Sequence, residues 1–343
     1  MEPLRVGLIG TGNSGKNIAQ AMASLPDVEI VGIASGHAEN AQTLAEKHGV
    51  PFATGDYHEL LEREEVEAVC VSVPHGLHHT VGMDVISAGK HLLLEKPMAT
   101  TVSQCDELTS AARKAGVRLG VFFQKRFSPT LRKMKEIVES GLGRAFHADV
   151  HVKWFRDQEY YGSSSWRGTW QLEGGGCLMN QASHPIDLVV WMLGDVKEAY
   201  AHVNTVGHDI EVEDLAAAVL KFASGVTCTI VGSTAIVPGF PSEVAVHGTE
   251  GTVRLVGDDL FVYGPGDPPD KEPLVGASHA NFADPTTFAL EEHQALVRDF
   301  VAAVREGRDP LVSGEEGRKA VEVIRAIYKS ATEGRVVTLP FDD

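Results

Sequence analysis

Three polar side chains near the middle of the chain have types and spacing that could support chemistry. Asn180, His184 and Asp187 stand at positions i, i+4 and i+7, directly after three glycines at 174–176. Residues at this spacing share one face of a helix, and consecutive glycines let a backbone approach a bulky group closely. Pro185 predicts either a kink at His184 or a helix that restarts at Pro185, because proline has no amide hydrogen. The pattern indicates a site, and a packed helix with a satisfied histidine explains it equally well.

A glycine-rich motif near the start of the chain could bind phosphate groups. It follows the apolar run Leu4–Ile9 and opens a helical stretch that ends near Ser24. The motif is G-x-G-x-x-G, whose glycines permit a tight turn and the close approach of a pyrophosphate to a helix N-terminus. Asn17 stands where a Walker A loop carries serine or threonine, which argues against a nucleoside triphosphatase. We therefore expect dinucleotide contacts from Gly10, Thr11, Gly12, Asn13, Ser14 and Gly15.

The end of the next expected strand, Glu29–Ala34, bears on the choice of cofactor. A fold that prefers NAD usually places Asp or Glu here to bind the adenosine ribose, and this chain has Ser35. Without that carboxylate a 2′-phosphate is not repelled, although no arginine stands nearby to bind it. We expect NAD(P) as the cofactor, with NADP(H) favoured over NAD(H). Its adenosine half would contact Ser35, Gly36, His37 and Asn40.

Further polar residues follow two apolar stretches that are typical of buried parallel strands. Ala68–Val73 ends in Pro74-His75, and His91–Leu94 ends in Glu95-Lys96. Ligands of a doubly wound sheet bind at the carboxyl ends of its strands, which would direct Lys96 at the nicotinamide end of the cofactor. The plainer alternatives are a loop of surface histidines and an exposed Glu95–Lys96 ion pair. The remaining expected cofactor contacts are Val73, Pro74, His75, His78, Glu95, Lys96 and Gln124.

Aromatic and cationic side chains gather just before the central glycines. The stretch 160–170 holds two tyrosines, two tryptophans and an arginine. Such side chains combine apolar faces with hydrogen-bonding edges, which suits a polyhydroxylated ring. Aromatic residues that plug a domain junction explain the stretch equally well. The expected substrate contacts here are Arg126, Trp154, Tyr160 and Arg167, and the irregular segment 262–287 would cap the site.

The surrounding elements change character at about residue 124. Before it, about six apolar strand segments alternate with helical ones, which predicts a doubly wound Rossmann domain over residues 1–124. From Val196 to Val262, short alternating segments separated by turns predict a mostly antiparallel sheet with an open face. The expected fold class is therefore α/β, with an α+β substrate-binding and oligomerisation domain over residues 125–343. A homodimer or homotetramer would cover the open face.

A strand expected at Ala145–Phe155 carries an H-x-D-x-H pattern on one face. His147, Asp149, His151 and Lys153 alternate along it. The pattern offers only three potential metal ligands, and their spacing does not require them to converge on one ion. A solvated or interface face is therefore favoured over a metal site, and no zinc-type spacing occurs elsewhere. We therefore predict no metal.

The overall composition limits the classes of partner. The chain has 30 Lys and Arg against 47 Asp and Glu, so its net charge is −17, and no dense basic stripe occurs. Nucleic acid and anionic membranes are therefore not expected as partners. The sequence shows neither a run long enough for a membrane span nor a signal peptide, and its four cysteines lack CxxC spacing. The expected location is the cytoplasm, where thiols stay reduced.

Taken together, the motifs resemble those of the Gfo/Idh/MocA oxidoreductase family (glucose–fructose oxidoreductase, inositol dehydrogenase and relatives). The likeness rests on Gly10–Gly15, Glu95-Lys96-Pro97, Gly174–Asp187, Gly248–Gly251 and Val297–Phe300, in this order. The resemblance implies that Lys96 orients the substrate hydroxyl and that His184 accepts its proton. Many members carry Asp at the position of Asn180, so Asn180 is expected to hydrogen-bond the substrate or the histidine rather than to take a proton.

The primary hypothesis is an NAD(P)-dependent dehydrogenase acting on a secondary alcohol of a sugar, a sugar derivative or a cyclitol. Lys96, Asn180 and His184 would form its catalytic group and contact the substrate while hydride passes to the nicotinamide. Two alternatives stay open. One is a lyase or glycosidase that keeps its cofactor bound and redox-cycled, and the other is a non-catalytic protein that senses dinucleotide or sugar.

Overall fold

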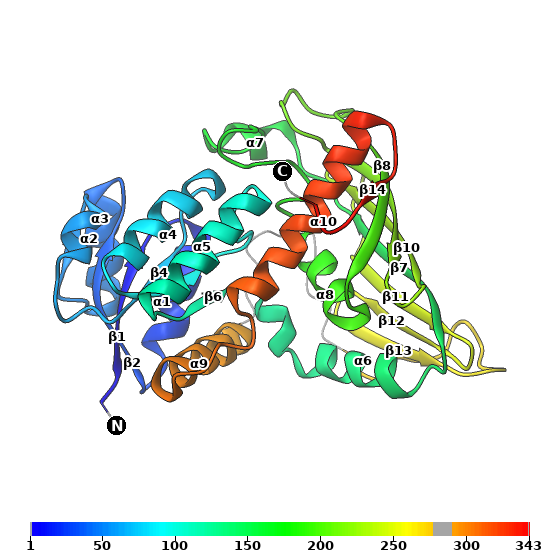
Figure 1. Ribbon diagram of the computed structural model, residues 1–343, viewed down its shortest axis with the longest axis horizontal. Coiled ribbons are helices and arrows are strands. Elements are labelled where there is room, and N and C mark those ends of the chain that lie inside the picture. Colours follow the sequence, from blue (N-terminus) through cyan, green and yellow to red (C-terminus); the bar gives the residue numbers. More distant parts are fainter. Residues whose placement is uncertain (1, 277–289, 342) are drawn as a thin grey trace. The chain divides into compact units, whose positions relative to one another are not determined.

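The computed structural model describes residues 2–276, 290–341 and 343, and it divides into two compact units. The first comprises Met1–Gln124 and Phe288–Arg318, and the second comprises Lys125–Thr287 and Lys319–Asp343. Figure 1 shows the elements of both units. From the sequence, all residues after 124 were expected in one domain. In the structure, the helix Leu290–Glu306 belongs to the first unit.

A six-stranded sheet forms the centre of the first unit. Its order is β3-β2-β1-β4-β5-β6, and every pairing is parallel. The strands are apolar along most of their length because helices pack against the sheet. This is the order of a doubly wound dinucleotide-binding fold, with its switch point between β1 and β4. The strands are β1 (Leu4–Ile9), β2 (Val28–Ala34), β3 (Ala53–Thr54), β4 (Ala68–Val71), β5 (His91–Leu94) and β6 (Leu119–Val121).

The helices of this unit include one that comes from far along the chain. Helix α9 packs on α1, and a Cβ on Gly120 of β6 would lie 3.1 Å from the Phe300 ring of α9. The buried stripe Leu296, Val297, Phe300 and Val301 explains why α9 joins this unit. The helices are α1 (Asn13–Ala23), α2 (Ala38–His48), α3 (Tyr57–Leu61), η1 (His75–Leu77), α4 (His78–Ser87), α5 (Val102–Ala115) and α9 (Leu290–Glu306), and η2 (Gln124–Phe127) begins at the last residue before the second unit.

An eight-stranded sheet dominates the second unit. Its order is β13-β12-β11-β7-β10-β9-β8-β14, in which β7 and β10 are parallel and the other pairs antiparallel. At one edge β14 pairs with β8, and at the other residues 274–275 hydrogen-bond to Leu260 of β13. The strands are β7 (Ala145–Lys153), β8 (Val196–Asn204), β9 (Leu215–Phe222), β10 (Thr227–Ser233), β11 (Glu243–Gly248), β12 (Thr252–Val256), β13 (Asp259–Tyr263) and β14 (Val337–Thr338).

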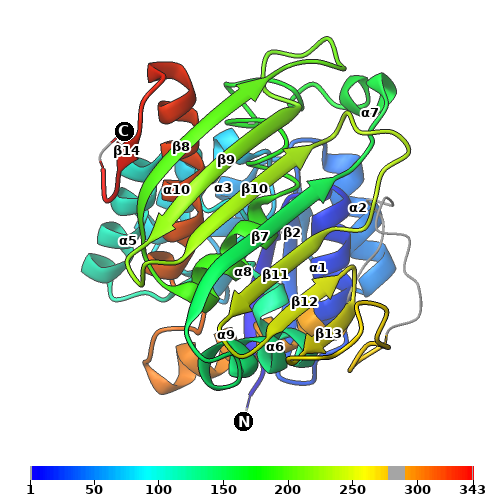
Figure 2. The same ribbon diagram turned by 90° about the vertical axis from the view of Figure 1, so that its right-hand side faces the viewer.

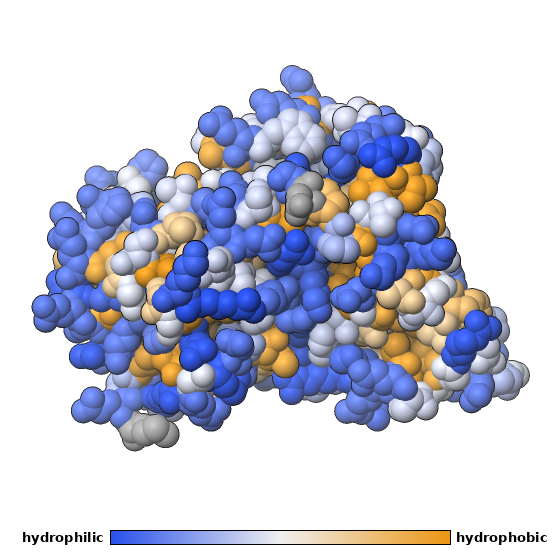
Figure 3. All heavy atoms as spheres, in the orientation of Figure 1, coloured by the Kyte–Doolittle hydropathy of each residue, from blue (hydrophilic) through white to orange (hydrophobic). Residues whose placement is uncertain are grey.

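Helices cover one face of this sheet, and Figure 2 shows the other face uncovered. Alternate residues of β7, such as Val150, join a core shared with α8 and α10. On the open face Tyr200 of β8 pairs with Val219 of β9, and both are exposed. In the view of Figure 3, apolar residues are visible at the surface of this unit. The predicted fold class, with its mostly antiparallel open-faced second sheet, is confirmed. The helices are α6 (Pro129–Ser140), α7 (Gln158–Gly162), α8 (Ser183–Leu193) and α10 (Gly314–Glu333).

The segment expected to cap the site, 262–287, lies only partly within the described residues. Its start belongs to β13, which the sequence did not suggest, and residues 277–289 lie outside the described part of the chain. The expected cap thus falls mostly outside the described part of the chain.

Candidate active site

The glycine turn after β1 lies at the switch point of the first sheet. Gly10 has a φ of 107°, and a Cβ there would lie 2.0 Å from the carbonyl oxygen of Ser72, just after β4. A Cβ on Gly15 would lie 2.2 Å from the carbonyl oxygen of Gly10. These two glycines are required by the packing of the turn itself.

Gly12 leaves space for a ligand. A Cβ on Gly12 would meet nothing within 4 Å, and Gly12, Asn13 and Ser14 are exposed. Gly12 caps α1, whose N-terminus has no side-chain cap and no acidic residue in its first turn. Bare N–H groups at the positive end of a helix bind phosphate. This turn therefore fits the pyrophosphate of a dinucleotide.

The residues expected at the adenosine half lie at the ends of β2 and in the turn beyond it. The hydroxyls of Ser35 and Thr11 are 2.9 Å apart, which joins this strand end to the glycine turn. Gly36, His37 and Asn40 are exposed beside it. Gln124, expected at the nicotinamide half, has a buried side-chain oxygen with no hydrogen-bond partner among the described residues.

His78 joins two of the loops around the site. It is fully buried, with Nδ1 2.7 Å from the carbonyl oxygen of Pro97 and Nε2 2.9 Å from that of Val73. Burial lowers the pKa of His78 to about 4. The ring joins the loops that follow β4 and β5. Both ring nitrogens are therefore held by backbone carbonyl groups, and the expected cofactor contact by His78 stays a prediction. His75, also buried, lies beside it with ring centroids 5.6 Å apart.

Glu95 holds the loop that carries Lys96. Its buried carboxylate accepts a hydrogen bond from the Lys96 backbone N–H at 2.9 Å and another from the Ser14 hydroxyl. Burial raises the pKa of Glu95. Lys96 itself is half-buried. The structure thus brings the glycine turn, Val73 and Lys96 to one edge of the first sheet.

In the second unit the central glycines pack inward. A Cβ on Gly175 would lie 2.2 Å from the Tyr328 hydroxyl, and one on Gly176 would lie 1.8 Å from the Glu213 carbonyl oxygen. The buried Glu213 carboxylate accepts hydrogen bonds from the backbone of Gly176 (2.7 Å) and Leu178 (2.9 Å) and from Tyr328 (2.9 Å). Burial raises the pKa of Glu213. The bulky group that these glycines approach is therefore part of the protein core.

Turns, rather than a continuous helix, connect the glycines to α8. Asn180 donates its backbone N–H to Gly176 at 3.0 Å, and α8 begins at Ser183. Pro185 is the third residue of the helix, where an N–H would have no intrahelical partner, so its ring costs no hydrogen bond. The predicted restart is confirmed and begins two residues before Pro185. His184 is half-buried in this first turn, between the buried Ser183 and Pro185.

Arg126 and Asp187 form a buried ion pair. Each side chain is 1% exposed, and two hydrogen bonds join them, Nε to Oδ2 at 2.9 Å and Nη2 to Oδ1 at 2.6 Å. A bidentate pair of this kind occupies the guanidinium fork. Arg126 thus directs Nε and Nη2 at Asp187, and its expected contact with substrate stays a prediction; Asp187 braces α8 one turn after His184.

Asn180 is held by a carboxylate that the sequence reasoning missed. Its Nδ2 donates to Glu173 Oε1 at 2.7 Å, and Glu173 Oε2 accepts from the Gly168 N–H at 2.6 Å. Glu173 is 1% exposed, and burial raises its pKa to about 7. The sequence does contain a signal for Glu173, because it is an acidic residue that directly precedes the glycines in an otherwise buried stretch.

Tyr160 is the centre of a cluster of aromatic and polar side chains. Its hydroxyl lies 3.1 Å from Gln181 Nε2, and the Arg167 guanidinium lies over its ring, 4.4 Å from the centroid. Arg156 lies over the rings of both Tyr160 and Trp154, at 5.5 and 5.2 Å. The structure thus brings the predicted Trp154, Tyr160 and Arg167 together and adds Arg156 and Gln181, which no sequence motif indicated.

Three polar atoms of this cluster are buried and have no hydrogen-bond partner among the described residues. They are Trp154 Nε1, Arg167 Nε and Gln181 Oε1. A buried polar atom left unpaired costs about 1–3 kcal/mol, so such atoms normally have a partner, whether protein, water or ligand. Two donors and one acceptor match the groups of a polyhydroxylated molecule.

Other polar groupings do not add to the site. On the open sheet face the Asp149 carboxylate lies 3.2 Å from His147 Nε2 and 3.3 Å from His247 Nε2. Within the described ranges no group of three or more His, Cys, Asp or Glu side chains could hold a metal ion. None of the helices in those ranges has the length and apolarity needed to cross a membrane.

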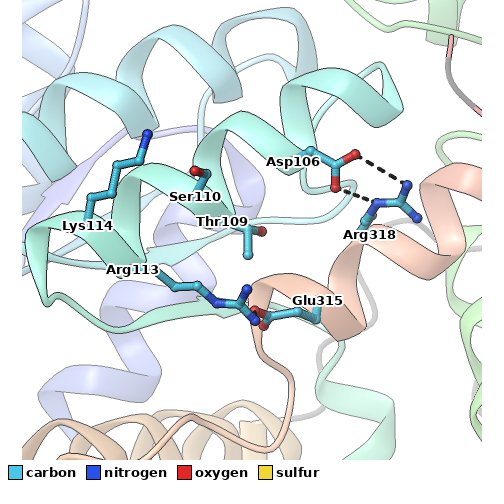
Figure 4. A pocket seen from close by; sticks show the side chains of 7 residues that line it. All are labelled: Asp106, Thr109, Ser110, Arg113, Lys114, Glu315 and Arg318. Atoms are coloured by element: carbon cyan, nitrogen blue, oxygen red, sulfur yellow. Dashed lines mark hydrogen bonds and ion pairs between the residues drawn. The ribbon is translucent and has the colours of Figure 1, made fainter.

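A surface hollow of about 290 Å³ lies on α5 and the start of α10 (Figure 4). Two of its cations are paired, Arg318 with Asp106 and Arg113 with Glu315. No residue of the candidate site lines it. The residues around it are Asp106, Thr109, Ser110, Arg113, Lys114, Glu315 and Arg318.

The chain resembles known proteins over nearly its whole length. Residues 4–123 match the model of the oxidoreductase family with an NAD-binding Rossmann fold, and residues 131–254 match the GFO/IDH/MocA C-terminal domain. Myo-inositol 2-dehydrogenase of Thermotoga maritima is 28% identical over 98% of each chain. D-xylose 1-dehydrogenase (NADP(+)) 2 of Haloferax volcanii is 28% identical over 97% of this chain and 99% of its own.

A solved structure covers the full length of the chain. It is the WlbA dehydrogenase from Bordetella pertussis in complex with NADH and UDP-GlcNAcA, with a TM-score of 0.88, 31% identity, and coverage of 100% of this chain and 99% of the other. That structure contains NADH, whereas the xylose dehydrogenase is named for NADP(+). The preference for NADP(H) predicted from Ser35 is therefore not supported, because relatives of both kinds match this chain.

Proposed function

The chain belongs to the Gfo/Idh/MocA family of NAD(P)-dependent oxidoreductases, and we propose that it oxidises a secondary alcohol of a sugar, a sugar derivative or a cyclitol. The observation that carries the proposal is the set of unpaired buried atoms around Tyr160, namely Trp154 Nε1, Arg167 Nε and Gln181 Oε1. Two donors and one acceptor beside aromatic faces suit a ring with several hydroxyls. The relatives named for myo-inositol and D-xylose support the same substrate class.

The chain's own residues would hold the cofactor and move the substrate proton. The N-terminus of α1 and the space over Gly12 take the pyrophosphate. A dinucleotide bound there would supply the hydride acceptor for the substrate carbon. His184, fixed in the first turn of α8, accepts the hydroxyl proton, and the Lys96 ammonium donates a hydrogen bond to the oxygen on which negative charge develops.

The test is oxidation of myo-inositol, D-xylose and UDP-GlcNAcA with NAD⁺ and NADP⁺ separately, followed by the absorbance of the reduced cofactor. Lys96→Ala and His184→Ala should each lower turnover by about 10²- to 10⁴-fold and leave NADH binding nearly unchanged. Lys133→Ala, on the exposed side of α6, is the control and should keep wild-type turnover.

Full activity in either site variant contradicts the assignment. A transient of reduced cofactor without net production would instead indicate a lyase that retains its cofactor. Tight binding of sugar and dinucleotide without any redox change would indicate a sensing protein.

The open sheet face supports a further part of the proposal, a homodimer or homotetramer formed through this face. Exposed apolar side chains such as Val219 of β9 lie on it, and so do paired charges such as Arg254 of β12 with Glu243 of β11. A mixed apolar and polar face of this kind is typical of subunit interfaces. Sedimentation of the purified protein decides it, because a monomer at micromolar concentration would contradict the proposal.

A further inference from the structure

Glu173 is a buried carboxylate for which the mechanism above has no use. Both of its oxygens are acceptors, Oε2 from the Gly168 backbone N–H and Oε1 from Asn180 Nδ2. A backbone N–H can only donate, so it commits Oε2 as an acceptor. When the carboxylate is ionised, Oε1 also carries no hydrogen and can only accept. While Glu173 is ionised, position 180 must therefore donate toward it.

This requirement fixes the orientation of the Asn180 amide. With Nδ2 directed at Glu173, Oδ1 is the atom on the opposite side of the amide, and Asn180 is half-buried next to the turn that leads to His184. We propose that Glu173 is a positioning residue that makes Asn180 a hydrogen-bond acceptor toward the substrate. The proposal rests on the proposed function, because it assigns the substrate a hydroxyl that donates to Asn180.

The surroundings of Glu173 explain why position 180 carries an amide. An aspartate there would place a second carboxylate against Glu173, and two carboxylates at such a distance cannot both ionise. The titratable groups that act on Glu173 are Arg167, which favours its charged form, and Glu213, Tyr161 and Tyr328, whose charged forms oppose it. Burial raises the pKa of Glu173 to about 7. Ionised Glu173 accepts from Asn180, whereas protonated Glu173 could donate and let the amide turn over.

A reciprocal exchange of the two residues tests the proposal. In Glu173→Gln the side-chain oxygen must stay on the Gly168 N–H, so the new NH₂ faces position 180 and forces Asn180 to turn Oδ1 toward it. In Asn180→Asp two carboxylates face each other. In the double variant Glu173→Gln/Asn180→Asp the glutamine NH₂ donates to the aspartate, whose second oxygen again faces the substrate as an acceptor.

We measure kcat/KM with the panel member that the wild-type protein oxidises fastest, and the melting temperature of all four proteins. Each single variant should lose about 10- to 100-fold in kcat/KM, the effect of one misdirected hydrogen bond to a charged or reacting group. The double variant should return to within a few fold of the wild type. Lys133→Ala again serves as the unchanged control.

Three outcomes overturn the proposal. These are wild-type kcat/KM in Glu173→Gln, a double variant no better than the poorer single variant, and a double variant that recovers its melting temperature without recovering kcat/KM. The last would show a pair that only holds the turn together. A wild-type protein that oxidises no panel member refutes the proposed function instead, and the hydrogen bond is then tested by whether the exchange restores the melting temperature.

Discussion

The buried pair of Arg126 and Asp187 should contribute strongly to the stability of the second unit. Because both side chains are 1% exposed, removing one partner leaves the other charge buried without this bidentate ion pair. Arg126→Met and Asp187→Leu should each lower the free energy of unfolding by about 3–5 kcal/mol. For a unit of this size that corresponds to a fall in melting temperature of about 6 to 20 °C. The double variant buries neither charge and should be more stable than either single variant.

The assay is urea unfolding followed by tryptophan fluorescence. All four tryptophans, at 154, 166, 170 and 191, belong to the second unit, so the signal reports on it directly. The matched control is Glu136→Gln, which breaks the exposed Lys133–Glu136 pair of α6 and should change stability by no more than about 0.5 kcal/mol. If the two single losses simply add in the double variant, the charges do not interact as the structure indicates.

The two glycine turns give opposite predictions for the same substitution. Gly176→Ala should unfold or severely weaken the second unit, because its Cβ would lie 1.8 Å from the Glu213 carbonyl oxygen. Gly12→Ala should keep wild-type stability within about 0.5 kcal/mol. It should nevertheless weaken NADH binding, because its Cβ enters the space over the turn. Unaltered NADH affinity would mean that the pyrophosphate lies elsewhere. Stability should also depend on the titration of Glu173, whose pKa rises from 4.5 in the unfolded chain to about 7 in the fold. The folded protein then holds the extra proton, so this contribution of about 3 kcal/mol is present below pH 4.5 and is lost as the pH rises to about 7. The free energy of unfolding, measured in urea between pH 4.5 and 8, checks this prediction. If Glu173→Gln shows the same change of unfolding free energy with pH as the wild type, Glu173 is not the cause.

The sequence predicted the first unit well because its signals are local. Apolar runs, the glycine turn after β1 and the polar residues after β4 and β5 lie in the order that a parallel sheet gathers at one edge. Lys96 and Gly12 could be placed there from spacing alone. The helix restart at Pro185 is also local, since it depends on one missing N–H.

The sequence could not predict partners that lie far along the chain. Asp187 pairs with an arginine 61 residues earlier, and Glu213 and Tyr328 fill the space beside glycines at 175 and 176. For the same reason sequence reasoning, which assigned Arg126 to the substrate, did not indicate its buried ion pair. The role of Glu173 depends on which way a neighbouring amide points, and no spacing rule contains that information.

The two closed edges of the second sheet restrict how copies of the chain can aggregate or assemble. A strand edge with free backbone groups is a template for adding strands from other molecules. Here β14 occupies the edge at β8, and residues 274–275 occupy the edge at β13. Both segments shorten the stretch of edge strand to which another molecule could add a strand. If copies pair through the open face as proposed above, a twofold axis would produce a closed assembly of defined size.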